Sequence, residues 1–170
     1  MEKELLIPRG TIERRVEELA NQISSDYKEK EPVLIGILNG VVFFFADLVR
    51  RLTVPIQIDF VRATSYGSGT VSSRDVRFTK DVEISLQDKP VILVEDIVDT
   101  GLTLKHIISR IENKNPESLR VCALIEKLER RETEVSIDYC GFRVDVGFVV
   151  GYGLDYNENY RDLPDVYVLR

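Results

Sequence analysis

The sequence predicts an α/β protein of three layers, in which a central, mainly parallel sheet lies between helices. Two observations predict this fold. Short, continuous apolar runs recur along the chain, and such runs are typical of strands that are buried on both faces. Segments with apolar residues at helical spacing lie between them, so strands and helices alternate. We see no repeat, low-complexity tract or linker, so we expect one domain over residues 1–170.

The first third of the chain predicts a helix, a strand and a second helix. Apolar residues at helical spacing over Thr11–Tyr27 indicate the first helix. Val33–Leu38 is a continuous apolar run, which is typical of a central parallel strand. Asn39 and Gly40 end this run, and helical spacing resumes over Val41–Leu52.

The middle of the chain predicts two strands separated by a loop. Apolar and polar residues alternate over Pro55–Arg62, the pattern of a half-buried strand. Residues Ala63–Asp75 are too rich in glycine and serine to form a regular element by themselves. Pro90–Val94 is the next buried strand, and Thr103–Ile111 has the spacing of a helix.

The last third predicts strands around a polar segment. Leu119–Ile125 and Val144–Val150 are apolar runs of strand length. Gly151–Leu163 mixes tyrosine, asparagine, aspartate and glycine, and a short final strand is expected at Val166–Leu169.

Composition excludes several classes of function. The net charge of −6 argues against electrostatic binding to nucleic acid or to an anionic membrane. No apolar run approaches the roughly 20 residues of a membrane span, and the N-terminus lacks the layout of a signal peptide. The spacing of Cys122 and Cys140 suggests neither a disulfide framework nor a zinc site, so we expect a reducing cytoplasm. With His106 as the only histidine, and expected at the surface, histidine-based triads are disfavoured.

Residues 91–104, VILVEDIVDTGLTL, carry the strongest functional signal. A buried strand runs into Glu95 and Asp96, and Asp99 opens a Thr-Gly-x-Thr turn before a helix. Open α/β sheets bind ligands at this end of their strands. Backbone N–H groups of residues 99–103 can hold a phosphate, while the first two acids can accept hydrogen bonds from ribose hydroxyls, directly or through hydrated Mg²⁺. A sugar phosphate is therefore the expected ligand. The alternative is a solvated strand end with Asp99 as an ordinary helix cap.

This segment resembles the signature of the type I phosphoribosyltransferases. Four further stretches are similar to the hypoxanthine and hypoxanthine-guanine members, and together they span most of the chain in the family's order. They are GILNGVVFFFADL at 36–48, Ser65-Tyr66-Gly67, LIEK ending at Lys127, and FVVGYGLDY at 148–156 with Arg161-Asp162-Leu163 behind it. The resemblance implies a small hood built from both chain ends.

The resemblance also implies a site for the phosphoribosyl pyrophosphate donor. Its pyrophosphate would lie on Leu38, Asn39 and Gly40, with a non-proline cis bond between the first two, although many relatives have lysine in place of Asn39. Residues 65–74 resemble the family's mobile lid, in which Ser65 and Tyr66 close over the pyrophosphate. Taken alone, these two stretches also fit a plain strand-to-helix turn and a glycine-rich hairpin without function. Further donor-binding residues implied by the family motif are Thr100, Gly101, Leu102, Thr103, Asp155 and Arg161, and Glu95, Asp96 and Asp155 would be associated with Mg²⁺.

The base site implied by the resemblance involves four residues. Lys127 would donate to the exocyclic oxygen of a 6-oxopurine and so reject an amino group. Phe148 would stack on one face of the purine, Ile97 could pack on the other, and the Val149 backbone would read the base edge. Without the resemblance, the lysine would be interpreted as solvated surface and the phenylalanine as core.

The implied reaction is Mg²⁺-dependent transfer of the 5-phosphoribosyl group to N9 of hypoxanthine or guanine. It gives IMP or GMP and pyrophosphate, as in purine salvage, and Asp99 is expected to take the proton from N7 of the purine. The family associates, so a homodimer or homotetramer is expected. Three alternatives stay open: a xanthine or other-base phosphoribosyltransferase, an RNA-binding regulator of pyrimidine genes, and a nucleotide-binding module without turnover.

Overall fold

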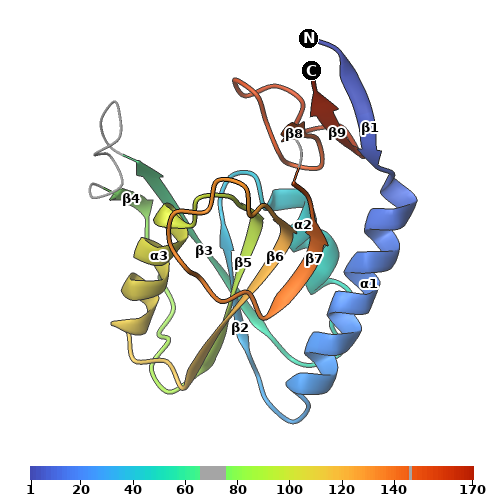
Figure 1. Cartoon of the computed structure of the whole chain (residues 1–170). Helices are drawn as coiled ribbons and strands as arrows, with labels where there is room; N and C mark the ends of the chain where they lie inside the picture. Colours follow the sequence, from blue (N-terminus) through green and yellow to red (C-terminus); the bar gives the residue numbers. More distant parts are fainter. Residues whose placement is uncertain (66–75, 146) are drawn as a thin grey trace.

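A computed structural model describes residues 1–65, 76–145 and 147–170. Tyr66 and most of the expected lid lie outside these residues. A six-stranded sheet forms the centre of the molecule (Figure 1), in the order β4-β3-β2-β5-β6-β7. The neighbouring strands β3, β2, β5, β6 and β7 pair in parallel, and the edge strand β4 pairs antiparallel with β3. The strands are β2 (Val33–Ile37), β3 (Gln57–Ser65), β4 (Val76–Lys80), β5 (Pro90–Val98), β6 (Ser118–Glu126) and β7 (Tyr139–Arg143).

Helices cover both faces of this sheet, which explains the continuous apolar runs of its central strands. Helices α1 (Arg9–Asp26) and α2 (Val42–Val49) lie on one face, and α3 (Leu102–Glu112) lies on the other (Figure 1). Successive strand residues point to opposite faces, so Leu34 packs in the core beneath α1 and α2 while Ile35 packs in the core beneath α3. The three-layer architecture predicted from the sequence is confirmed.

A second sheet of three antiparallel strands joins the two ends of the chain. Its order is β1-β9-β8, and its strands are β1 (Lys3–Ile7), β8 (Phe148–Val150) and β9 (Val166–Leu169). In Figure 1 it stands above the edge of the central sheet where β2 and β5 end. The expected hood from both termini is therefore present.

Several predicted boundaries were wrong. The expected strand Val144–Val150 is reduced to β8, and it belongs to the hood. Strand β5 continues to Val98, because hydrogen-bonded pairing with β6 persists that far. Strand β3 continues to Ser65, and α2 ends at Val49 rather than Leu52. Strands β1, β4 and β7 were not predicted.

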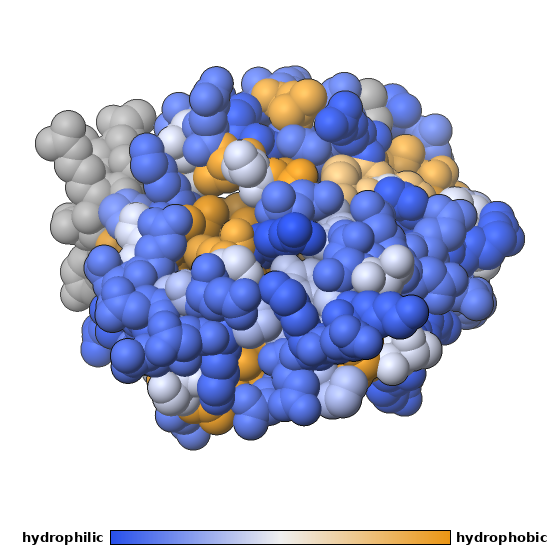
Figure 2. Space-filling view, turned by 90° about the horizontal axis from the view of Figure 1, so that it is seen from below, coloured by the Kyte–Doolittle hydropathy of each residue, from blue (hydrophilic) through white to orange (hydrophobic). Residues whose placement is uncertain are grey.

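Polar side chains cover most of the face shown in Figure 2, with smaller apolar patches between them. Within residues 1–65, 76–145 and 147–170, no helix is both long and apolar enough to span a membrane. The thiols of Cys122 and Cys140 are both free.

Candidate active site

Two adjacent carboxylates form the acidic part of the site. Because β5 continues to Val98, Glu95 and Asp96 lie within the strand and are half-buried rather than at a solvated strand end. Burial and the charge of Asp96 raise the pKa of Glu95 well above its ordinary value, and burial raises the pKa of Asp96. The charged forms of two carboxylates held together in this way are stabilised by any ligand that brings hydroxyl donors or positive charge.

Asp99 lies directly beyond the end of β5, and its two carboxylate oxygens differ. Oδ2 lies 3.3 Å from Nη1 of Arg130, whereas Oδ1 is buried and accepts no hydrogen bond from the described residues. The N-cap residue of α3 is Gly101, which has φ of 83°, and among the described residues Asp99 accepts no hydrogen bond from the first turn of this helix. The helix-cap alternative for Asp99 is therefore wrong. A buried acceptor without a partner is suited to receiving a proton from a ligand.

The loop after β2 packs tightly against this acidic group. The peptide bond between Leu38 and Asn39 is cis, as the resemblance implied. A Cβ added at Gly40 would lie 1.8 Å from Oδ2 of Asp96, and one added at Gly153 would lie 2.0 Å from the carbonyl oxygen of Gly40. Only glycine fits at position 153, where the neighbour is backbone, and a side chain at position 40 would displace the Asp96 carboxylate or the loop, so three distant segments of the chain converge here.

A cavity of about 210 Å³ opens beside these groups. It brings together most of the predicted base-binding residues with part of the acidic group. Its lining residues are Asp96, Ile97, Asp99, Lys127, Arg130, Phe148, Val149, Leu154 and Asp155. Two of these, Arg130 and Leu154, were not among the residues predicted to bind a ligand. Arg130 stands in a run of charged residues, a pattern that indicates only solvated surface, so its contact with Asp99 becomes visible only in three dimensions.

Two of the residues expected to contact the purine have surroundings that differ from those expected without the resemblance. Lys127 is buried, with 6% exposure, and its ammonium donates to the carbonyl oxygen of Gly147 at 2.7 Å. Phe148 is 49% exposed, and its ring makes an edge-to-face contact with the ring of Tyr156, with the two ring centroids 5.5 Å apart. The lysine is thus not a solvated surface residue, and the phenylalanine is not a core residue. Sequence reasoning missed Gly147 and Tyr156 as their supports.

The residues predicted to bind pyrophosphate and Mg²⁺ do not form a single cluster of side chains among the described residues. Arg161 donates to the carbonyl oxygen of Gly153 at 2.8 Å and pairs with Asp155 at 3.4 Å. Within the described part of the chain, no three acidic, cysteine or histidine side chains are gathered so as to hold a metal ion by themselves. The donor set nevertheless fits Mg²⁺, which usually binds one or two carboxylates together with water and substrate phosphates.

The remaining predicted residues that the structure describes are not among those that line this cavity. Thr100 to Thr103 form the turn into α3, where the hydroxyl of Thr100 accepts from the N–H of Leu102 at 3.3 Å. Ser65 is the last residue of β3, beside the part of the chain that the structure leaves undescribed, and Tyr66 lies in that part.

Known proteins match both the sequence and the fold. The family described as "Phosphoribosyl transferase domain" matches residues 8–157. The hypoxanthine phosphoribosyltransferase of Salmonella typhimurium is 44% identical over 96% of this chain and 93% of its own, and the hypoxanthine-guanine phosphoribosyltransferase of Dictyostelium discoideum is 43% identical over the same shares. The crystal structure of a hypoxanthine-guanine phosphoribosyltransferase from Bacillus anthracis superimposes with a TM-score of 0.95 at 38% identity, over 100% of both chains. The chain belongs to the phosphoribosyltransferase family, in the group of the hypoxanthine and hypoxanthine-guanine phosphoribosyltransferases.

Proposed function

We propose that residues 1–170 act as one domain that transfers the 5-phosphoribosyl group of phosphoribosyl pyrophosphate to N9 of hypoxanthine or guanine. The products are IMP or GMP and pyrophosphate, and the role is purine salvage. The observation that carries this proposal is the cavity beside the acidic pair, which is lined by Asp99, the buried Lys127 and the exposed Phe148. The names of the relatives support the same reaction.

The donor sugar is held by the acidic pair and by the turn that follows it. Glu95 and Asp96 accept hydrogen bonds from the ribose hydroxyls, and the N–H groups of residues 99–103 hold the 5-phosphate. Backbone donors of residues 38–40, with Arg161 and Ser65, bind the pyrophosphate. In a glycosyl transfer the C1–O bond loosens first and positive charge spreads over the ring, so these groups stabilise the leaving group and the cation. The role of Tyr66 stays a prediction.

The base is oriented by the opposite wall of the cavity. Lys127 donates to the 6-oxo group, Phe148 and Ile97 cover the two faces of the ring, and the Val149 backbone reads its edge. Asp99 takes the proton from N7 as N9 attacks, which makes the purine a better nucleophile. A 6-amino group would place donor against donor at Lys127, so adenine is expected to be a poor substrate.

Mg²⁺ completes the site. Glu95, Asp96 and Asp155 would hold the ion, and its positive charge would neutralise that of the departing pyrophosphate. Burial raises the pKa of both Glu95 and Asp96, so positive charge bound beside them would favour their ionised forms.

The family and the surface support a proposal about assembly, and the cysteines support one about location. We propose a homodimer or homotetramer. Of the apolar run at 41–45, Val42 and Phe43 are each 42% exposed while their neighbours are buried, so part of this run is available as interface. A cytoplasmic location agrees with the two free thiols.

One assay tests the activity. Purified protein is mixed with Mg²⁺, phosphoribosyl pyrophosphate and each nucleobase in parallel, and nucleotide formation is followed by absorbance. Hypoxanthine and guanine are expected to react, and adenine and the pyrimidines are not. Xanthine in the same series decides the closest alternative. Turnover of no base, together with a salt-dependent gel shift with RNA, would favour the regulator instead.

A further inference from the structure

We propose that Arg131 is a positioning residue that fixes the general base Asp99 relative to the purine-reading Lys127. This inference rests on the roles proposed above for those two residues. Arg131 itself does not line the cavity, which distinguishes it from its neighbour Arg130. Its side chain is only 15% exposed, in a stretch of charged residues that is otherwise mostly solvated.

The guanidinium of Arg131 bridges the ends of two neighbouring strands. Nε donates to the carbonyl oxygen of Asp99 at 2.9 Å, and Nη2 donates to the carbonyl oxygen of Lys127 at 3.2 Å. Pairing between β5 and β6 ends just before this point, where the N–H of Lys127 donates to the carbonyl oxygen of Val98 at 2.9 Å. Just beyond that bond, the side chain of Arg131 links Asp99 of one backbone to Lys127 of the other.

The residues that follow Arg131 hold the same turn from the same side. The N–H groups of Glu132 and Thr133 donate to the carbonyl oxygen of Thr100 at 3.0 and 3.2 Å. A Cβ added at Gly101 would lie 3.0 Å from the carbonyl oxygen of Thr133 and 3.4 Å from Cδ of Arg131. Residues 131–133 therefore form a bracket against the turn 99–101, in which the backbone holds Thr100 and the guanidinium holds Asp99.

Arginine is suited to this task because its planar group offers several donors at fixed angles, whereas lysine offers a single nitrogen. Its charge is balanced by Glu126, whose carboxylate lies 3.5 Å from Nη2 and is buried with 8% exposure. The same carboxylate pairs with Arg143 at 3.3 Å. The contribution of Arg131 is thus geometric, since another cation already accompanies Glu126.

Such a bridge controls the two groups that must contact the purine simultaneously. The carboxylate of Asp99 must reach N7 while the ammonium of Lys127 reaches the neighbouring 6-oxo group. A misplacement of about 1 Å can lower a rate by roughly 10²-fold. Losing the bridge should therefore impair proton transfer from the purine to Asp99 more than it impairs binding of phosphoribosyl pyrophosphate, since Thr100 stays held by backbone N–H groups.

The test compares R131K with R143Q, each alone and in the D99N background. R131K keeps the charge and stem but loses the fork of donors, and R143Q removes the other cation from Glu126 without touching Asp99 or Lys127. We expect R131K to lower kcat/KM for hypoxanthine roughly 10- to 100-fold, with the dissociation constant for phosphoribosyl pyrophosphate changed less than about threefold. R143Q should match the wild type in both measurements.

The double variant gives the decisive result. If Arg131 acts through Asp99, R131K should lower kcat/KM little further in the D99N background, because the effects of substitutions at residues that act as a unit are not additive. Equal fractional losses in the two backgrounds, or equal losses of turnover and donor affinity in R131K, would overturn the proposal.

A second measurement requires no activity. Hydrogen exchange of the amides of residues 99–101 should accelerate in R131K and not in R143Q; unchanged exchange in R131K would also overturn the bridge. A wild-type protein that uses no 6-oxopurine would instead contradict the proposed function, and exchange would still report on the bridge.

Discussion

At the scale of single residues, Asp99 owes its proposed role to the different surroundings of its two oxygens. Changing it to asparagine preserves shape but removes the proton acceptor. We expect turnover to fall by ~10²-fold or more while the affinity for phosphoribosyl pyrophosphate stays largely intact. Steady-state kinetics and calorimetric titration of the donor check this. Asp88→Asn is the matched control, because Asp88 is exposed and asparagine tolerates its φ of 60°. Unchanged turnover in Asp99→Asn would exclude the general-base role.

Lys127 is a second residue whose burial has a chemical purpose. Lys127→Ala removes the donor for the 6-oxo group and leaves the carbonyl oxygen of Gly147 without its 2.7 Å partner. We expect use of hypoxanthine and guanine to weaken much more than donor binding. Kinetics with both purines and donor titration measure the two effects, and Lys105→Ala, an exposed change on α3, is the control. Equal losses in purine use and donor binding would count against this pocket assignment.

Gly40 tests the contact between the loop after β2 and the acidic pair. Alanine at position 40 would place its Cβ 1.8 Å from Oδ2 of Asp96, so the carboxylate or the loop must move. Because both bind the donor in our proposal, we expect Gly40→Ala to weaken donor binding at least tenfold, an effect of about 1.4 kcal/mol. Gly10→Ala is the control: its nearest neighbour would be 3.7 Å away in α1, and alanine there should stabilise the fold by roughly 0.5–1 kcal/mol. Donor affinity that is equal in both variants would refute the assignment.

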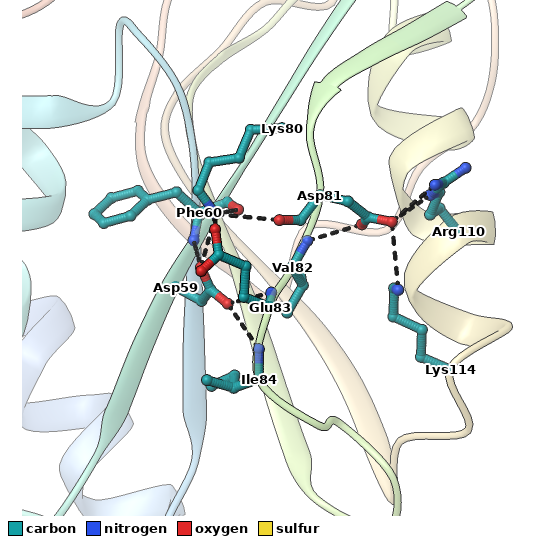
Figure 3. Close-up of polar contacts among 9 residues, drawn as sticks. All are labelled: Asp59, Phe60, Lys80, Asp81, Val82, Glu83, Ile84, Arg110 and Lys114. Atoms are coloured by element: carbon teal, nitrogen blue, oxygen red, sulfur yellow. Dashed lines mark hydrogen bonds and ion pairs between the residues drawn. The ribbon is translucent and has the colours of Figure 1, made fainter.

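At the scale of elements, two aspartates anchor the segment that follows β4 (Figure 3). Asp59 on β3 accepts hydrogen bonds from the N–H groups of Glu83 and Ile84 at 2.7 and 3.1 Å and from the ammonium of Lys80 at 3.0 Å. Asp81 in turn accepts from Arg110 of α3 at 2.7 Å, and Lys114 pairs with it at 3.4 Å. The return strand of the β3–β4 hairpin is thereby tied both to the sheet and to the helix that follows the phosphate turn.

This anchor predicts a pH-dependent loss of stability in Asp59→Asn. Burial alone would raise the pKa of Asp59, but the hydrogen bonds from Glu83, Phe60, Lys80 and Ile84 together hold it below its ordinary value. Its contribution to stability is therefore complete above the unfolded pKa of about 3.9 and is lost as the pH falls through the lower folded pKa. We expect Asp59→Asn to cost about 1–3 kcal/mol at pH 7 and less below pH ~4.

Urea unfolding of wild type and variant at pH 7 and pH 3.5 measures this difference. Glu83→Gln is the control, since the side chain of Glu83 is 78% exposed and its pairing with Lys80 should contribute little. A difference between wild type and Asp59→Asn that is the same at both pH values would show that the charge of Asp59 is not what stabilises the anchor.

The elements that could be predicted from the sequence are those whose burial leaves a clear pattern. The central strands β2, β5 and β6 are apolar on both faces, and α1 carries a regular apolar stripe. Strand β1 is mostly exposed and β7 only partly buried, so their stability comes from pairing with β9 and β6, which is not visible in their own composition. Propensity is a weak guide for such edge strands.

The residues of the site likewise divide into those that could be predicted from the sequence and those that could not. The acids of β5 could be located because a strand end in a parallel sheet has a known position. The supports of the site could not, because they depend on contacts between distant segments. Gly153 is needed because it faces Gly40 and has φ of 97°, and Arg131 is notable because its donors reach two backbone carbonyl groups of the site.

At the scale of the whole molecule, the donor and Mg²⁺ should stabilise the fold together. Glu95 and Asp96 on β5, the loop at 38–40 after β2 and Asp155 beyond the hood strand β8 all belong to the proposed donor site, so a bound donor would link both sheets. A ligand at 100 times its dissociation constant adds about 2.7 kcal/mol. For a chain of this size each kcal/mol raises Tm by roughly 2–4 °C. We therefore expect Tm to rise by about 5–10 °C with phosphoribosyl pyrophosphate and Mg²⁺.

The pattern of this shift separates the proposed site from weak binding elsewhere. Without Mg²⁺ the donor brings its own negative charge to two carboxylates whose pKa values are already raised, so the shift should largely disappear. Differential scanning fluorimetry with donor, Mg²⁺ and both together measures it, and ribose 5-phosphate, which lacks the pyrophosphate, is the matched ligand control. Asp96→Asn should reduce the shift, whereas Asp88→Asn should not. A full shift with the donor alone, or one that survives in Asp96→Asn, would mean that the donor binds away from the acidic end of β5.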